Sequence, residues 1–211
     1  MRLELGKPAR TSDQAVAKLA DVVIDADSGR VTHLVVQPGE DQPARLVPIE
    51  LVQGDGELSL SISSDALKEL EAVQAYEFIR PGESLEEDPK WDVGVEDVYT
   101  TPSYGAADIG VYGADPSYGM GIAYDRVPKG EVELRRASSV YSADDHHLGH
   151  VDGVVVDDSN GITHLLFERG HFWWRREISI PADAVASFAT DMVKLGVNKQ
   201  EAERFPSQRR R

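Results

Sequence analysis

Residues 21–36 read Asp-Val-Val-Ile-Asp-Ala-Asp-Ser-Gly-Arg-Val-Thr-His-Leu-Val-Val, and residues 153–167 read Gly-Val-Val-Val-Asp-Asp-Ser-Asn-Gly-Ile-Thr-His-Leu-Leu-Phe. Each stretch places a turn rich in Asp, Ser and Gly between two β-branched runs, a pattern typical of a β-hairpin. The shared Thr-His-Leu aligns His33 with His164. The chain therefore contains the same hairpin twice, and Gly29 is expected at positive φ in the first turn.

The similarity continues on both sides of the hairpin. Upstream, Thr11–Val16 aligns with Ala143–Leu148, which puts Gln14, Ala15 and Lys18 at the positions of His146, His147 and His150. Downstream, Leu46–Val52 aligns with Ser179–Val185, and Leu58–Leu60 aligns with Val193–Leu195. Each copy spans about 75 residues and has its own strands and turns, so two similar small domains are expected rather than a solenoid.

Each copy also carries signals for where its strands and its helix end. Pro48 and Pro181 lack a backbone donor, so we expect them at a strand end or at an edge position. Asn198 and Glu201 have the spacing of a capping box, which predicts a short helix near the end of the second copy. Its counterpart in the first copy is Ser64–Leu70, which has two leucines on one helical face.

Three elements together suggest a family. They are the hairpin at residues 22–36, the strand Ile178–Val185 and the ending Val193–Lys199. The pattern resembles the PRC-barrel family, the small β-barrel of the photosynthetic reaction centre H subunit and of the C-terminal domain of the ribosome maturation factor RimM. The resemblance implies a mainly all-β fold with two small antiparallel PRC-type β-barrels, each ending in a short helix. It concerns packing and turns, so it implies no catalytic residues.

The repeat predicts four segments: residues 1–80 as the first barrel, 81–130 as a linker or packing arm, 131–206 as the second barrel and 207–211 as a basic tail. The linker is acidic at first and then rich in Tyr and Gly, with Tyr104 and Tyr118 in two Pro-Ser-Tyr-Gly repeats. A connector of this length is either a mobile spacer or an arm whose tyrosines pack on a barrel or on a second subunit.

Charge and composition exclude several classes of protein. The 211 residues include 22 Lys and Arg against 37 Asp and Glu, which gives a net charge of −15. This acidity argues against direct nucleic-acid binding, because phosphate contacts need cations. The absence of Cys excludes disulfides, thiol catalysis and Cys-based zinc sites. Because no signal peptide and no apolar run of about 20 residues is present, we expect a cytoplasmic protein without a membrane span. Peripheral association with a membrane complex remains compatible with this pattern.

Histidine and aspartate clusters offer candidate metal sites, each with a simpler alternative. His146, His147 and His150 are candidates for Zn²⁺ or Ni²⁺, although a polar turn explains them more simply. The two Asp-rich turns suggest Ca²⁺ loops, but turns held by Asp side chains account for them without a metal. His33 and His164 are interpreted as half-buried strand residues bonded to the backbone, with a pH-sensitive pair as the alternative.

The densest aromatic stretch is the best candidate for a surface that binds a partner. It contains Phe172, Trp173, Trp174 and Arg175, and consecutive strand residues must face both sides of a sheet. One of the two tryptophans is therefore exposed unless the linker or a helix covers it, and Trp and Arg are enriched at binding hot spots. With Tyr104 and Tyr118 of the linker, these residues are the predicted partner-binding set.

These observations support three hypotheses of different classes. The first is a non-enzymatic adaptor that binds an unidentified protein partner, needs no cofactor and forms a homodimer. The second is a barrel that binds a small ligand or a metal through the His-rich second copy. The third, which the charge of −15 opposes, is ribosome or RNA maturation. Solution mass with and without EDTA or Zn²⁺ separates the first two hypotheses.

Overall fold

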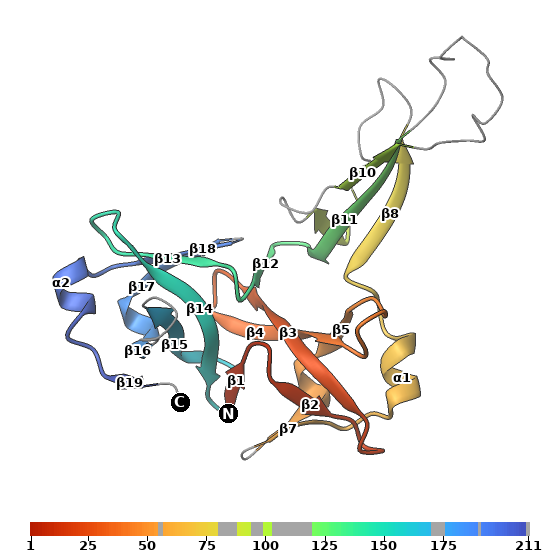
Figure 1. Ribbon diagram of the computed structural model, residues 1–211, viewed down its shortest axis with the longest axis horizontal. Coiled ribbons are helices and arrows are strands. Elements are labelled where there is room, and N and C mark those ends of the chain that lie inside the picture. The colour runs from red at the N-terminus through yellow and green to blue at the C-terminus, as the bar shows by residue number, and fades with distance from the viewer. Residues whose placement is uncertain are drawn as a thin grey trace, which may run out of the picture. The chain divides into compact units, whose positions relative to one another are not determined.

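The computed structural model describes residues 1–54, 57–79, 88–93, 99–102, 120–169, 176–189 and 191–209. In this part the chain is mostly β with two short α-helices, so the predicted all-β class is confirmed (Figure 1). The chain forms two compact units: the paired unit, Met1–Ala72 with Gly130–Arg211, and the insert, Val73–Lys129. Within the described ranges, neither α-helix has the length and apolar character needed to cross a membrane.

The first copy of the repeat forms a sheet around the predicted hairpin. Its elements are β2 (Pro8–Arg10), β3 (Val16–Asp25), β4 (Arg30–Gln37), β5 (Arg45–Pro48), a 3-10 helix (Ile49–Leu51), β6 (Val52–Gln53), β7 (Leu58–Leu60) and α1 (Ser64–Glu69). The strand order is β5-β4-β3-β2-β7-β6, and only β2 and β7 run parallel within this path. Because side chains alternate along a strand, Val22 and Ile24 of β3 and Leu34 and Val36 of β4 are buried together.

The second copy repeats this sheet. Its elements are β13 (Ser139–Tyr141), β14 (His147–Val156), β15 (Ile162–Arg169), β16 (Arg176–Pro181), a 3-10 helix (Ala182–Ala184), β17 (Val185–Ala189), β18 (Met192–Leu195), α2 (Lys199–Ala202) and β19 (Ser207–Arg209). The path β16-β15-β14-β13-β18-β17 matches the order in the first copy, with β13 and β18 parallel, and β19 pairs with β16. The two stretches of sequence therefore build the same arrangement of strands.

The two copies exchange strands, which joins them into one body. Strand β1 (Arg2–Glu4) pairs with β14 of the second copy, with Leu3 opposite Val154. Strand β12 (Glu131–Leu134) pairs with β3 of the first copy, with Leu134 opposite Val22. Val22 and Val154 are equivalent, so the exchange is reciprocal (Figure 1). One continuous apolar core contains residues of both copies, and the paired unit is thus an internal pseudo-dimer.

The two hairpin turns also meet in the paired unit. The Val31 amide donates to the Asn160 carbonyl, and the Ile162 amide donates to the Gly29 carbonyl, both at 2.9 Å. Gly29 has a φ of +64°, which confirms the predicted positive φ, and Asn160 has the same value. Asn160 is therefore the structural equivalent of Gly29. Asn adopts this left-handed conformation more readily than most residues, which explains how the second turn manages without Gly there.

The structure corrects the sequence alignment before the hairpin by one residue. The Thr11 amide donates to the Ala15 carbonyl at 3.0 Å, and the Ser142 amide donates to the His146 carbonyl at 3.0 Å. These equal turns make Ala15, not Gln14, the equivalent of His146. The extra residue of the second copy lies inside the sheet, where a register shift between β13 and β14 forms a bulge. A comparison of sequence letters could not place this bulge.

Strand ends and helix starts follow the local signals in the sequence. Pro48 and Pro181 are the last residues of β5 and β16, as expected. Asn198 and Glu201 form the predicted capping box of α2. Helix α1 has a single cap, in which the Ser63 hydroxyl accepts from the Ala66 amide. In the part described, both sheets are open paths that end at β5 and β6 or at β17 and β19.

The insert has a sheet of its own. Strands β8 (Gln74–Ile79), β9 (Trp91–Val93), β10 (Tyr99–Pro102) and β11 (Met120–Pro128) lie in the order β10-β11-β8, and β9 pairs with the other end of β11. The Tyr124 hydroxyl donates to Glu77 at 3.0 Å, and the Arg126 guanidinium lies 4.7 Å from the Trp91 ring centroid. The described part of the predicted linker is thus β-structured.

Candidate functional site

The aromatic residues predicted to face a partner lie outside the described residues. They are Phe172, Trp173, Trp174 and Arg175, together with Tyr104 and Tyr118 of the linker. Their role in partner binding therefore stays a prediction, and the candidate site must be built from other residues.

The histidines proposed as metal ligands lie around the start of β14. Nδ1 of His146 is 3.0 Å from the Asp144 carbonyl oxygen and 3.2 Å from its carboxylate. The rings of His147 and His150 have centroids 5.0 Å apart, and the Tyr141 ring packs edge-on against His147 at 5.4 Å. Among the residues described, these three histidines do not come together as a group of metal-ligating atoms.

The bulge explains which histidines meet. Residues three apart on a regular strand face opposite sides of the sheet. Here Val140 lies opposite Gly149 while Tyr141 lies opposite His147, so one extra residue of β14 is accommodated between these pairs. The bulge turns His147 and His150 toward each other. His146 remains in the turn beside Asp144, and the arrangement is a polar turn with an aromatic contact.

His33 and His164 occupy equivalent positions, and both are half-buried as expected. Their nearest hydrogen-bond partner differs from the backbone group that we predicted. Nδ1 of His33 lies 3.1 Å from the Thr32 hydroxyl, and Nδ1 of His164 lies 3.3 Å from the Thr163 hydroxyl. Among the described residues, an ion-pair contact with an acid is found for His33, whose Nδ1 lies 3.5 Å from Glu131 of β12, and not for His164. The same contact between a Thr hydroxyl and the following His therefore occurs in two places that differ in nearby charge.

The Asp-rich turns are held by their own side chains, which supports the metal-free interpretation. Oδ1 of Asp25 accepts from the amides of Asp27 and Ser28 at 3.0 and 2.9 Å. Oδ1 of Asp157 accepts from the amides of Ser159 and Gly161 at 2.8 and 3.0 Å. These bonds favour the ionised form and lower both pKa values, through the Ser28 amide for Asp25 and first through the Ser159 hydroxyl for Asp157.

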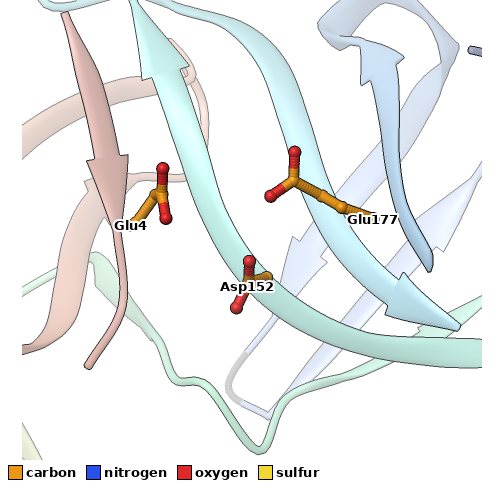
Figure 2. Close-up of side chains that lie close together, drawn as sticks. All are labelled: Glu4, Asp152 and Glu177. Atoms are coloured by element: carbon orange, nitrogen blue, oxygen red, sulfur yellow. The ribbon is translucent and has the colours of Figure 1, made fainter. Parts of the chain in front are cut away.

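Among the described residues, three carboxylates come together near the place where β1 pairs with β14 of the second copy. They belong to Glu4 of β1, Asp152 of β14 and Glu177 of β16, and one oxygen of each lies within 4.8 Å of the other two. Figure 2 shows the three side chains converging between these strands. Asp152 is completely buried, and Glu177 is 9% exposed. We call these three residues the carboxylate cluster.

Two cations of the N-terminal segment already face the carboxylate cluster. The Arg2 guanidinium donates to Glu177 at 2.5 Å and to Glu4 at 2.8 Å, and Nζ of Lys7 lies 3.8 Å from Glu4. Partial burial opposes the charged form of Arg2, but the bonds and charges of Glu177 and Glu4 outweigh it and raise its pKa. Carboxylate oxygens are the ligands that Ca²⁺ and Mg²⁺ prefer. A metal ion here would compete with Arg2.

The described residues of the first copy form no such cluster at the equivalent place. Asp152 is the residue skipped in the register between β14 and β15, and the residue skipped between β3 and β4 is Ala20. Arg45 of β5 is equivalent to Ile178 of β16, because the two residues pair with equivalent residues of β4 and β15. The preceding residue is Ala44 in the first copy and Glu177 in the second. The sheet thus forms with alanines at both positions, so the two acids are not a requirement of the fold.

Strand β12 carries its charges in the opposite order from β1. Glu133 and Arg135 stand at the positions of Arg2 and Glu4, because Leu134 is equivalent to Leu3. Glu133 is buried and accepts from Arg135 at 3.0 Å, while Asp191 lies 3.8 Å from the same guanidinium. An Arg and a Glu two residues apart therefore occur in β1 and, in reversed order, in β12 together with the residue that follows it.

Sequence reasoning missed the carboxylate cluster. One signal was present, because Asp152 interrupts an apolar stretch that the first copy fills with Ala20. An acid inside a buried strand needs a partner. The other two acids of the cluster lie on β1 and β16, far from Asp152 or from each other in the sequence, and 175 residues separate Arg2 from Glu177. Spacing along the chain could not reveal this contact.

Two open recesses flank Arg2. One, of about 300 Å³, is lined by Arg2, Glu4, Lys7, Pro8, Glu57 and Leu58. The other, of about 360 Å³, is lined by Arg2, His164, Glu177, Ser179, Pro181, Phe205 and Pro206. Both recesses mix polar and apolar groups around the docked N-terminal strand.

No protein-family model matches the chain, and no curated protein matches it either.

Proposed function

We propose that the protein is a non-enzymatic assembly adaptor built from two PRC-barrel-type domains, and that it binds proteins, beginning with a second copy of itself in a homodimer. The observation that carries this proposal is an exposed aromatic side chain on an edge strand of the insert. The PRC-type assignment rests on the repeated hairpin, the proline-ended strand and the capped terminal helix. Closure of each sheet into a barrel belongs to the same proposal.

The edge strand is β8. In the described part of the insert it pairs on one side only, with β11. Tyr76 in its middle is 74% exposed, more than the other large apolar side chains that the structure describes as exposed, Val16 at 57% and Met192 at 43%. The Tyr76 hydroxyl donates to Gln74 at 2.5 Å, which helps to hold the ring in place.

An edge strand offers backbone donors and acceptors to another strand, and an exposed aromatic ring adds contact area at small entropic cost. A second β8 from another chain meets both needs, because a two-fold axis brings identical edges together. Natural proteins often protect such an edge with Lys. The described residues of β8, from Gln74 to Ile79, contain no Lys, so this edge is suited to pairing.

The test is the mass of the full chain in solution, measured by sedimentation equilibrium. We expect a species of twice the chain mass of 23.2 kDa. Tyr76→Lys is expected to raise the dimer dissociation constant at least about tenfold, because it removes a hot-spot side chain and charges the edge. The matched control is Val16→Lys, which changes an exposed apolar residue of the paired unit and should leave association unchanged.

Two outcomes would reject the proposal. One is a wild-type chain that stays monomeric at an assay concentration of 100 μM, and the other is a Tyr76→Lys variant that associates like the wild type. Circular dichroism establishes that the variants are folded. The run is repeated with EDTA and with Zn²⁺. A dimer that requires Zn²⁺ would instead favour the metal-binding alternative through His147 and His150 (5.0 Å between ring centroids).

A further inference from the structure

The edge of β14 that receives β1 has two features that the matching edge of β3 lacks. The first is the pair Asp152 and Glu177, which replaces two alanines of the first copy. The second is Gly153, where an added Cβ would lie 2.1 Å from the carbonyl oxygen of Leu3. The equivalent residue of the first copy is Asp21, which has a side chain. The close approach of β1 therefore depends on Gly at this position.

Charge distinguishes the two strands that the edge could receive. Arg2 of β1 meets Glu177 at 2.5 Å. If β12 lay there instead, Glu133 would take the place of Arg2 and Arg135 that of Glu4, so the ion pair of Arg2 with Glu177 would be replaced by two facing acids. Like charges in a buried setting repel strongly. If β1 instead paired with β3, Arg2 would lie beside Ala44, the equivalent of Glu177, and would lose its ion pair.

We propose that Asp152, Gly153 and Glu177 form a strand-docking site that selects an extended segment with a base at the position of Arg2 and rejects an acid there. Its occupant is β1 of the same chain. The site directs β1 to β14 of the second copy, and β3 of the first copy then pairs with β12. The two copies therefore form the pseudo-dimer with a single arrangement of exchanged strands. The carboxylate cluster is then an element of recognition within the chain, occupied by Arg2.

The proposal is tested by hydrogen–deuterium exchange of the backbone amides of residues 3–5 in the full chain. The Leu5 amide reports directly, because it donates to the Asp152 carbonyl at 2.8 Å. We expect Arg2→Glu and Glu177→Arg, each alone, to speed exchange of these amides at least tenfold. The combined variant, Arg2→Glu with Glu177→Arg, should restore exchange to within about threefold of the wild-type rate.

Two further variants separate selection by charge from general loosening. Asp152→Ala installs the residue of the first copy, so it should reduce the effect of Arg2→Glu at least threefold when the two changes are combined. Arg10→Glu is the matched control, because Arg10 forms a 3.1 Å ion pair with Glu57 at the surface of the first copy. It should leave β1 exchange at the wild-type rate.

The proposal is overturned if Arg2→Glu leaves β1 protected, or if the double charge swap exchanges as fast as the single variants. It is also overturned if Arg10→Glu speeds β1 exchange as much as Arg2→Glu, since the effect would then reflect net charge. These readouts concern β1 within one chain. They do not depend on dimer formation through β8, so failure of one proposal leaves the other standing.

Discussion

The two copies of the repeat share one strand order but differ at the place where each receives a strand from the other. In the first copy, β12 pairs with the strand that contains Ala20. In the second copy, β1 pairs with the strand that contains the buried Asp152 at the equivalent position. Both sheets form, so apolar packing and backbone pairing are sufficient for the architecture. The comparison teaches that the shared strand order does not require these carboxylates, and we assign them to the choice of the exchanged strand.

The copies also differ in how the same turn is achieved. The first hairpin uses Gly29 and the second uses Asn160, each with a φ of +64°. At the helix, α2 has a full capping box and α1 a single Ser63 cap. Each copy can therefore serve as a control for the other, because a substitution in one copy can be compared with the equivalent substitution in the other.

The largest expected effect tests whether the copies really form one body. Leu34 and Leu165 are equivalent and completely buried. Leu34→Ala and Leu165→Ala should each lower the free energy of unfolding by about 2–5 kcal/mol. Because β1 and β12 are exchanged, each change should shift a single transition of the whole paired unit, as measured by differential scanning calorimetry. Two transitions, of which only one moves with each variant, would contradict the exchange.

The next effect sharpens the difference between the two receiving edges. Gly153→Ala places a Cβ 2.1 Å from the Leu3 carbonyl oxygen, and overpacking of this kind typically costs about 1–3 kcal/mol. Chemical denaturation measures the loss. The matched change Asp21→Ala in the first copy removes a 3.3 Å bond from the Arg136 amide and introduces no overlap with a neighbouring strand. Equal losses in the two variants would argue against a close strand approach that is special to the second copy.

Helix capping gives a smaller effect. The combined change Asn198→Ala with Glu201→Ala removes both bonds of the α2 capping box and should lower the free energy of unfolding by about 1 kcal/mol or more. Ser63→Ala removes one bond at α1 and should cost less than this double change. Urea unfolding of both variants gives the order, and a larger loss for Ser63→Ala would show that the box adds nothing to a single cap.

The smallest effect concerns acid. The Thr11 hydroxyl and then Ser64 hydrogen-bond the exposed Asp13 and lower its pKa from 3.8 to about 2. A depressed pKa means that these bonds stabilise the fold above about pH 4 and are lost as the pH falls toward 2. The melting temperature of wild type should exceed that of Asp13→Asn at pH 5.

This difference should close between about pH 4 and pH 2. Asp144, the equivalent residue of the second copy, accepts from the Lys199 amide at 3.0 Å. Its pKa is also lowered, first through the Ser142 side chain, so Asp144→Asn should show the same trend. A constant difference across the pH range would rule out the ionised carboxylates as the cause.

Much of the fold was predictable because its signals are local. β-branched runs around an Asp- and Gly-containing turn define the hairpin, and side-chain capping defines the start of α2. Proline ends β5 and β16 because it lacks the donor that a continuing ladder requires. The strands of the insert were harder to foresee, since their partners are separated by long stretches of sequence.

The sequence by itself determined the mostly β class, the duplication and the turns, since neighbours along the chain set backbone conformation. Only the tertiary structure decided that β1 and β12 change places and that Glu4, Asp152 and Glu177 converge. The physical reason is distance along the chain. A three-residue strand such as Arg2–Glu4 can satisfy its backbone on any open edge. Packing and charge at that edge, contributed by residues about 150 to 175 positions away, decide which edge it takes.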